Sequence, residues 1–532
     1  MLGIGSTFLF EGEALMQGVI LDGPDNKGLY PVLILHPSNA NDFEECRIDG
    51  DESHNPLATR IGAVRIDPWD CRRLSQADIH RHAGEAAFHM STASMDKIFR
   101  AVGKKAARSH FNAVHAPREF VPEKSPVPVS GKCWGAEEME SLTDASLDFW
   151  LTTGRFNDQF EESFARTVGR KHALSVNSGS SANLVAISTL CSPKLGERRL
   201  KPGDEVITVA AGFPTTVAPI VQNGLVPVFV DVTPPTYNAV PEQIAAAVGP
   251  RTRAIFLAHT LGNPFDINTV LNIAQKHDLW VIEDSCDALG ARYMLSGEDA
   301  PRMCGSFGHI ATFSFYPAHH ITMGEGGAVV CDDTKLYRIA MSMRDWGRDC
   351  WCAPGRDDSC HKRYQWKFPL LPEGYDHKYV YSHLGYNLKI TDMQAAIGLR
   401  QLERLNSFVE ARRRNFTRLH AALQKFEGDV LTLPQATEHS IPSWFGFLIT
   451  LRPHVNRTAL LEHLNAQKIG TRLLFAGNML RQPCFEGVTS RQVGELQGTD
   501  TILRNTFWVG CFPGLGDGHM DYIAKAITEY FK

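Results

Sequence analysis

The chain has 532 residues, 43% of them hydrophobic and 21% charged, and its formal net charge is −5. This composition is typical of a globular protein with room for several domains. So small a net charge gives no general attraction to nucleic acid or to an anionic membrane. We find no apolar run long enough to cross a bilayer and no secretory signal at the N-terminus. We therefore expect a cytoplasmic protein with its twelve cysteines reduced.

The first 90 residues differ from the rest of the chain. Segments 30–38 and 58–69 have the apolar composition of strands and are separated by a polar loop, which predicts a small β-rich extension. No motif in this extension indicates a chemistry, so its role stays open. A helix followed by a Pro-rich linker is predicted for residues 91–133.

From residue 134 onward, apolar strands alternate with amphipathic helices. The predicted strands are 204–210, 226–232, 253–259, 279–284, 310–316 and 327–332. Such alternation is typical of an α/β fold in which helices cover both faces of a parallel or mixed sheet. We assign residues 134–391 to this large domain. A long helix, about 392–425, then opens a smaller α/β domain that covers residues 392–532.

A strand, a Gly/Ser turn and a helix are predicted in LSVNSGSSANLVAIS, residues 174–188. The free N–H groups at the helix start, together with the hydroxyls of Ser180 and Ser181, could form a cradle for a phosphate. The more common role of such a turn is simply to cap the helix.

Another polar strand end occurs in LWVIEDSCDALGA, residues 279–291, where Asp284 ends an apolar strand. Ligands bind at this edge of open α/β sheets. Asp284 could therefore hold the protonated ring nitrogen of a pyridoxal-type cofactor. The alternative is a cap for the helix that follows.

The segment IATFSFYPAHHITMGEGGAVV, residues 310–330, resembles the sugar aminotransferase family of the DegT/DnrJ type. In that family a strand ends in Ser-Phe, and a lysine five residues after the serine binds the cofactor covalently, ahead of a Gly-Glu-Gly-Gly segment. Here Ser314 matches the serine and residues 324–327 match the glycine segment, but the lysine position holds His319. Without that amine the cofactor must be held by non-covalent contacts.

This departure resembles one branch of the family, formed by CDP-4-keto-6-deoxyglucose 3-dehydrase and its relatives. The similarity extends over about residues 92–532 and includes WLTTGRFNDQFE, AAGFPTT, DWGRDCWCAPG and HLGYNLKITDMQAA. It implies the aspartate-aminotransferase-like fold of type I pyridoxal-phosphate enzymes, with a large mixed-sheet domain and a smaller C-terminal domain. The first 90 residues have no counterpart in this resemblance.

Three cysteines, Cys350, Cys352 and Cys360, lie close together in RDCWCAPGRDDSC. Three thiolates in one loop are good metal ligands, but a fourth ligand is needed, and the spacing alone does not decide between zinc and a [2Fe–2S] cluster. The resemblance implies the cluster and supplies Cys286 as the fourth ligand. Cys304 is the rival, because the segment before His319 is somewhat longer here than in the family.

The resemblance also implies roles for individual residues around a pyridoxamine phosphate. His319 would move protons, with Tyr316 and Asp287 orienting it or the departing hydroxyl, and His320 would be structural. The remaining implied contacts are Asp284 to the ring nitrogen, Phe213 stacked on the ring, Gly179, Ser180 and Ser314 to the phosphate, Asn387 to the phosphate of a second subunit, and Arg472 to a nucleotide diphosphate. The contact from Asn387 implies a homodimer.

The function implied is removal of the 3-hydroxyl from a nucleotide-linked 4-keto-6-deoxy sugar, as in 3,6-dideoxysugar biosynthesis for a lipopolysaccharide O-antigen. CDP is the expected nucleotide, with TDP and GDP as alternatives. No G-x-G-x-x-G fingerprint is present, so electrons should come from a separate reductase. A sugar aminotransferase is disfavoured by the missing lysine. A non-catalytic iron–sulfur sensor would leave Asp284, Ser314 and His319 without a purpose.

Overall fold

The structure is a computed structural model of the chain, which forms two compact units. One unit comprises residues 1–117 and 135–149, and the other comprises 118–134 and 150–532. The described residues are 6–10, 16–20, 29–37, 45–46, 64–75, 88–89, 92–117, 119–352, 354–355 and 358–532. Within these ranges, none of the helices has both the length and the apolar character needed to span a membrane.

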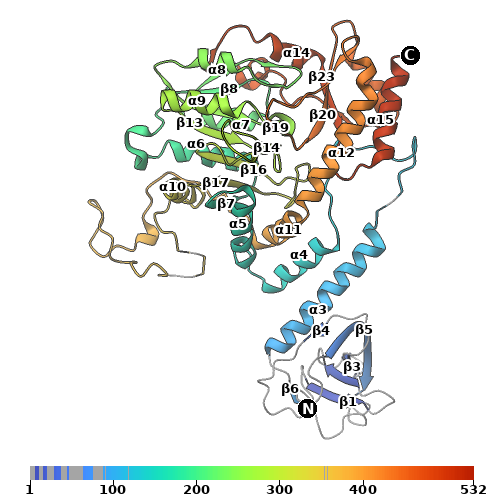
Figure 1. Cartoon of the computed structure of the whole chain (residues 1–532). Helices are drawn as coiled ribbons and strands as arrows, with labels where there is room; N and C mark the ends of the chain where they lie inside the picture. The colour runs from blue at the N-terminus through green and yellow to red at the C-terminus, as the bar shows by residue number, and fades with distance from the viewer. Residues whose placement is uncertain are drawn as a thin grey trace. The chain divides into compact units, whose positions relative to one another are not determined.

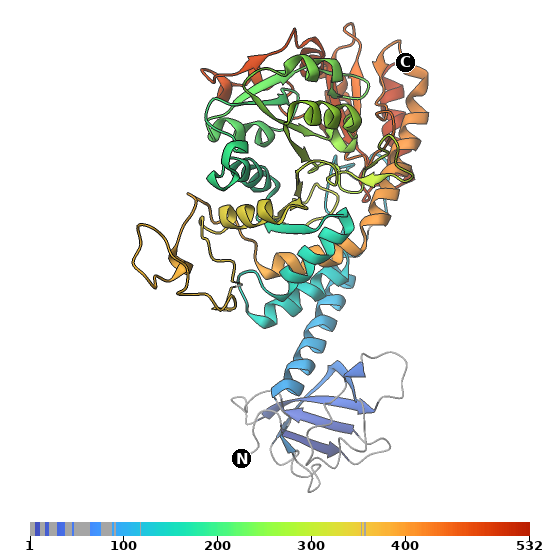
Figure 2. The ribbon, with the colours of Figure 1, turned by 60° about the vertical axis from the view of Figure 1, so that its left-hand side comes forward.

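The first unit contains an antiparallel six-stranded sheet, which Figures 1 and 2 show in blue. In sheet order its strands are β4 (Glu45–Cys46), β5 (Val64–Ser75), β3 (Leu29–Pro37), β2 (Met16–Ile20), β1 (Ser6–Phe10) and β6 (Phe88–His89). The helical elements of this unit are α3 (Thr92–His110), the π-helical turn η1 (Phe111–His115) and α4 (Ala136–Asp148). Arg100 of α3 pairs with Asp144 and Asp148 of α4, at 2.5 and 2.8 Å. The described part of the N-terminal segment thus forms a β-sheet, and a helix follows it.

The second unit is built on a mixed eight-stranded sheet. Its strands, in sheet order, are β22 (Arg491–Gln492), β9 (Val226–Val230), β8 (Glu205–Val209), β12 (Thr252–Ala258), β13 (Trp280–Asp284), β16 (Ile310–Ser314), β17 (Gly327–Cys331) and β7 (His172–Val176). All neighbours are parallel except β17, which is antiparallel to both β16 and β7. All six predicted strands are present, and the carboxyl ends of the parallel strands share one edge.

The alternating side chains of the central strands build two cores, one on each face of the sheet. On β12, Ala254 and Phe256 pack toward α6 and α10, whereas Ile255 and Leu257 pack toward α9. Figure 1 shows helices on both sides of these strands. The helices of this unit are α5 (Arg155–Val168), α6 (Gly179–Leu190), α7 (Pro214–Gln222), α8 (Pro241–Ala247), α9 (Ile267–His277), α10 (Thr334–Arg344), α11 (Asp392–Glu403), α12 (Leu405–Leu423), α13 (Arg457–Ala466), α14 (Gln497–Asn505) and α15 (Asp517–Tyr530).

The C-terminal part contributes a four-stranded antiparallel sheet with helices packed against it. In sheet order its strands are β18 (Leu431–Thr432), β20 (Gly446–Leu451), β23 (Thr506–Gly510) and β21 (Thr471–Arg472). The prediction of one long helix over about residues 392–425 is wrong in one respect. It is two helices, α11 and α12, because the hydrogen-bond ladder stops at Arg404, whose N–H bonds to Gln401 in a tighter turn.

Short elements complete the second unit. They are the strand pair β10 (Val232–Thr233) and β11 (Asn238–Ala239), the three strands β15 (Arg302–Met303), β14 (Arg292–Tyr293) and β19 (Ser440–Ile441), and the 3-10 turns η2 (Pro193–Arg198), η3 (Thr260–Gly262), η4 (His377–Tyr379), η5 (Gln424–Phe426), η6 (Met479–Arg481) and η7 (Pro483–Phe485).

Glu283 fixes the position of the strand end that carries Asp284. Its fully buried carboxylate accepts hydrogen bonds from the backbone N–H groups of Gly305, Phe307 and Gly308, at 2.6 to 2.8 Å. Burial alone would raise the pKa of Glu283, but the hydrogen bond from His259 and the charge of Arg170 outweigh burial and lower that pKa. The loop that leads into β16 is thereby tied to β13.

We expect Glu283→Gln to lower the free energy of unfolding by about 3 kcal/mol at neutral pH, because an amide N–H₂ would face donors that need an acceptor. The pKa of Glu283 is lowered on folding, so the wild-type protein loses this stabilisation as the pH falls, and the two proteins should converge in acid. Urea unfolding at several pH values measures the difference. Glu298→Gln, in an exposed pair with Arg302, is the control. Equal losses for both variants would contradict the assignment.

Candidate active site

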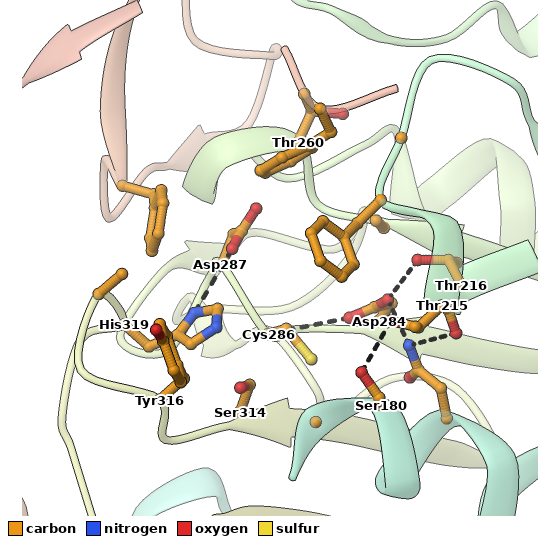
Figure 3. A pocket seen from close by; sticks show the side chains of 18 of the residues that line it. Ser180, Thr215, Thr216, Thr260, Asp284, Cys286, Asp287, Ser314, Tyr316 and His319 are labelled. Carbon is orange, nitrogen blue, oxygen red and sulfur yellow. Dashed lines mark hydrogen bonds and ion pairs between the residues drawn. The ribbon is translucent and has the colours of Figure 1, made fainter. Parts of the chain in front are cut away.

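A cavity of about 840 Å³ opens at the carboxyl edge of the sheet in the second unit. Asp284 at the end of β13, Ser314 at the end of β16 and the first turn of α6 meet there (Figure 3). Of the residues predicted for catalysis or cofactor binding, the cavity brings together Gly179, Ser180, Phe213, Asp284, Asp287, Ser314, Tyr316 and His319. Residues more than 130 positions apart in the sequence thus line one cavity.

The start of α6 is suited to bind a phosphate. Ser178 caps the helix by accepting a hydrogen bond from the Ser181 N–H, and the Ser180 hydroxyl lies 3.1 Å from Thr215 Oγ1. A Cβ atom at Gly179 would lie only 2.4 Å from the Cβ of Ser314. Only glycine therefore lets the helix start approach the end of β16 so closely. Free backbone N–H groups, hydroxyls and the positive end of the helix dipole converge here.

Asp284 is a buried carboxylate held by three donors. Its Oδ2 accepts hydrogen bonds from Asn183 at 2.9 Å and Thr216 at 2.7 Å, and its Oδ1 accepts from the backbone N–H of Cys286 at 3.1 Å. The side chain is therefore fixed at the floor of the cavity (Figure 3). A fixed carboxylate in this position can bind a protonated ring nitrogen. The alternative role as a helix cap does not apply, because no helix follows β13 directly.

Two phenylalanine rings also line the cavity. Phe213 is about half exposed and precedes α7, and its ring meets that of Phe475 edge to face, with centroids 5.4 Å apart. Both rings line the cavity. A half-exposed phenylalanine fixed in this way offers an apolar surface on which a flat ligand could stack.

His319 faces Asp287, with 3.5 Å between Nδ1 and Oδ1 (Figure 3). Both side chains are 16% exposed. Burial lowers the pKa of His319 to about 4 and raises that of Asp287 to about 8. Burial therefore favours the neutral form of both groups. Neutral imidazole is the form that accepts a proton.

The neighbours of His319 differ in exposure. His320 is buried, and its Nε2 lies 2.8 Å from the Ser443 carbonyl. Burial holds the pKa of His320 well below its ordinary value, as suits the structural role expected for it. Tyr316 is half exposed on the wall of the cavity. Phe445, which the sequence did not single out, packs its ring 5.3 Å from that of His319.

The four cysteines expected to bind one metal are in two places. Cys286 lines the cavity beside Asp284, and burial together with the charge of Asp284 raises the pKa of its thiol well above the ordinary value. The other three lie in the loop between α10 and η4, which projects from the second unit in Figures 1 and 2. The rival ligand, Cys304, is buried in the apolar core of the sheet.

Within the loop, the thiols of Cys350, Cys352 and Cys360 lie close enough for Cys352 to shift the pKa of both others. The Sγ of Cys360 also lies 3.2 Å from Nε2 of His377, whose buried ring stacks on Trp366. Burial raises the pKa of the Cys350 thiol to about 11. No group of three or more His, Cys, Asp or Glu side chains is arranged for a metal ion among the residues that the structure describes.

Several other residues define the edges of the site. Arg472 of β21 lines the cavity. Asn387 is exposed and does not line the cavity of the single chain described here. Asn183 and Thr216 lie within segments that resemble the family, but only the fold shows that both bind Asp284. Arg412, a third residue that the sequence did not indicate, donates a hydrogen bond to the backbone carbonyl of His319.

Known proteins of similar sequence cover most of this chain. The chain is 58% identical over 422 residues to the lipopolysaccharide biosynthesis protein RfbH of Salmonella typhimurium, a match that covers 79% of this chain and 95% of that protein. It is 52% identical over 413 residues to the dTDP-4-dehydro-2,6-dideoxy-D-glucose 3-dehydratase of Saccharopolyspora spinosa, covering 77% of this chain and 88% of that enzyme.

A solved structure shows the same fold. The E. coli GDP-4-keto-6-deoxy-D-mannose-3-dehydratase with bound hydrated pyridoxal phosphate superposes with a TM-score of 0.66 at 29% identity, covering 75% of this chain and 98% of that one. The fold of type I pyridoxal-phosphate enzymes is thus confirmed. The DegT/DnrJ/EryC1/StrS aminotransferase profile matches residues 132–528, and the chain belongs to that family.

Proposed function

We propose that this chain is a pyridoxamine-phosphate-dependent dehydratase that removes the 3-hydroxyl of a nucleotide-linked 4-keto-6-deoxyhexose. The observation that carries the proposal is the imidazole of His319 in place of the cofactor-binding amine, paired with Asp287 in the cavity. No lysine is among the described residues that line this cavity. Relatives named 3-dehydratases, at 52% and 33% identity, support the reaction class.

The residues of the cavity fit the cofactor. Gly179 leaves room beside Ser314 for a phosphate at the start of α6, and Asp284 would hold the ring nitrogen. Phe213 would stack on the ring. The bound cofactor would supply an amine for the C4 ketone and a ring that accepts an electron pair.

Proton transfer falls to His319 in this scheme. Its neutral imidazole would accept the proton that becomes acidic next to the cofactor ring, and it would then give a proton to the departing 3-hydroxyl. Asp287 would orient the ring and exchange its own proton with it across 3.5 Å. Tyr316, half exposed on the cavity wall, is placed to contact the substrate hydroxyl.

Electrons must also be supplied, because replacing a hydroxyl by hydrogen consumes two electrons and two protons and releases water. We infer that Cys350, Cys352 and Cys360, which share one loop, bind a [2Fe–2S] cluster with Cys286 as the fourth ligand. The donor set of thiols suits such a cluster. A bound cluster would pass electrons one at a time from a separate reductase.

The nucleotide and the subunit arrangement complete the proposal. Arg472 lies in the wall of the cavity, where it could contact a diphosphate. We propose CDP as the nucleotide, while relatives are named for dTDP- and GDP-linked sugars. The similarity to RfbH supports a place in lipopolysaccharide synthesis. The exposed Asn387 fits a homodimer in which it reaches the phosphate of the partner's site.

Turnover of a panel of CDP-, dTDP- and GDP-linked 4-keto-6-deoxy sugars tests the function. We expect loss of the 3-hydroxyl, seen by mass spectrometry, only with the pyridoxamine form and an electron donor such as dithionite with a mediator. In a second arm of the experiment, glutamate is the only donor of amino groups or electrons that is added. It is chosen because a related structure holds a pyridoxal-phosphate–glutamate adduct. An aminated product with an intact 3-hydroxyl would show a sugar aminotransferase instead.

His319→Lys should abolish dehydration and let the cofactor bind covalently, because an amine then stands at the position that the family uses. Borohydride treatment followed by mass spectrometry should show a cofactor adduct in the variant and none in the wild-type protein. His320→Lys is the control, since that side chain is buried away from the cavity. Undiminished dehydration by His319→Lys would rule out the proposed proton transfer.

Cys286→Ser should lower the iron content of the reconstituted protein and change its visible absorption, because one of four thiolate ligands is lost. Cys304→Ser should leave both unchanged, since Cys304 is buried in the core. Iron and acid-labile sulfide assays with visible absorption measure the effect. Iron that falls in Cys304→Ser but not in Cys286→Ser would reverse the ligand assignment.

A further inference from the structure

A second cavity, of about 330 Å³, lies where α10 and η2 meet the loop that holds Cys350, Cys352 and Cys360. Figure 1 shows this loop leaving the second unit beside α10. Cys350, one of the proposed cluster ligands, lines the cavity. The other side chains at this place have no part in the proposed function. The cations among those that line the cavity are Lys194, Lys335, Arg338 and Arg348.

Three of these cations have no carboxylate partner. Within the described part of the chain, no Asp or Glu lies within ion-pair distance of Lys335, Arg338 or Arg348. Lys335 and Arg338 are also exposed to solvent. Lys194 differs, because its amine pairs with the carboxylate of Asp349. A group of like charges on one surface attracts a partner of opposite charge.

The carboxylates at the start of α10 are already used within the fold. Asp333 caps the helix by accepting hydrogen bonds from the backbone N–H groups of Lys335 and Leu336. Asp332 pairs with the buried Arg170 at 2.7 Å. Neither carboxylate forms an ion pair with the three cations. This surface therefore keeps an excess of positive charge, although the net charge of the whole chain is −5.

An exposed indole belongs to the same surface. Trp351, which stands between Cys350 and Cys352 in the sequence, is 41% exposed. The Cζ atom of Arg338 lies 5.0 Å from the centroid of its ring, and the centroid of the Trp366 ring lies 5.1 Å away. Tryptophan and arginine are enriched among the residues that contribute most to protein–protein binding. The cationic surface so formed consists of Lys335, Arg338, Arg348 and Trp351.

We propose, on the basis of the function proposed above, that the cationic surface is where the separate electron donor docks, and that this donor is a protein with an acidic face. Complexes that transfer electrons have small interfaces, and opposite charges speed their formation. Each docking event would move one electron from the donor, which is oxidised, to the cluster, which is reduced. Two such events would supply the two electrons that replacement of the 3-hydroxyl by hydrogen consumes, and solvent would supply the protons.

The position and size of the surface favour a redox protein over other anionic partners. Because Cys350 lines the cavity, a protein bound there would stand next to a proposed cluster ligand. A nucleic acid is usually held by more phosphate contacts than three cations can make. The indole of Trp351 adds an apolar anchor of the kind that protein interfaces use.

The first experiment measures how a plant-type [2Fe–2S] ferredoxin, an acidic one-electron carrier, binds the full-length protein after reconstitution with iron and sulfide. Biolayer interferometry should show binding that weakens as salt is added, because salt screens exposed charges. The double variant Lys335→Glu/Arg338→Glu should bind about tenfold more weakly at low salt. Lys335→Arg/Arg338→Lys keeps both charges and should bind like the wild-type protein. Absence of ferredoxin binding, or equal binding by the charge-reversed variant, overturns the proposal.

A second double variant controls for the change in net charge. Lys276→Glu/Lys425→Glu reverses two exposed charges on α9 and η5. α9 packs on the opposite face of the sheet from α10. Ferredoxin binding should be unchanged in this variant, and an equal loss would contradict a local docking surface. Cytochrome c, a basic one-electron carrier, should not bind the wild-type protein.

Chemical cross-linking locates the contact directly. A carbodiimide joins a lysine amine to a carboxylate of the partner as an amide, with loss of water. Peptide mass spectrometry of the ferredoxin complex should find this bond at Lys335 or at Lys194, which lines the same cavity. Lys335→Arg should lose the bond at that position and still bind ferredoxin. Cross-links found only at lysines elsewhere on the protein would refute the assigned surface.

Other occupants of the surface would give different results. An oligothymidine strand that binds through Lys335 and Arg338, when ferredoxin does not, would make this a nucleic-acid site. A change of oligomeric state in Lys335→Glu/Arg338→Glu, measured by analytical ultracentrifugation, would make it a contact between copies of the chain. Either result overturns the proposal.

These measurements separate the docking surface from the proposed function. A protein that dehydrates its substrate with dithionite, but binds no ferredoxin, would retain the function and reject the surface. A protein that binds ferredoxin through Lys335 and Arg338, but dehydrates no sugar, would reject the function and retain the surface.

Discussion

The carboxylate of Asp284 at the end of β13 is the constraint on which the site depends. Its two oxygens are bound from α6, from α7 and from the turn after β13, so one side chain fixes three elements that meet at the sheet edge. In the proposed function, a cofactor bound to Asp284 would lie between the start of α6 and His319. The buried carboxylate of Glu283 points to the other face of the same strand. It accepts hydrogen bonds from the loop before β16 and so helps to fix the end of β13.

Charge distribution gives the site its chemical character. The imidazole of His319 and the carboxyl of Asp287 face each other 3.5 Å apart, and burial favours the neutral form of both. In the proposed reaction this pair takes up and releases one proton at neutral pH. An amine in place of His319 would be charged and would compete for the cofactor covalently, which is the chemistry of the aminotransferases in the same family.

The cysteines divide into two groups that the fold places differently. Cys286 is fixed in the cavity wall by the turn after β13, whereas Cys350, Cys352 and Cys360 share a loop that projects from the second unit. Within that loop, the ring of His377 lies within hydrogen-bond distance of the Cys360 thiol and stacks on Trp366. A cluster with ligands from both groups would connect the cofactor cavity to the surface, where a reductase could deliver electrons.

The sequence by itself determined the α/β class, the six main strands and several of the residues that line the cavity, because the strand pattern and the Asp284, Ser314 and His319 motifs are local in the chain. It did not show the break at Arg404, the partners of Asp284 or the place of Phe445 and Arg412. The break at Arg404 is a local turn, but the partners of Asp284 and the places of Phe445 and Arg412 depend on contacts between segments far apart in the sequence, such as the 93 positions between His319 and Arg412. Burial of an arginine, and hence its effect on a distant histidine, exists only once the tertiary structure has formed.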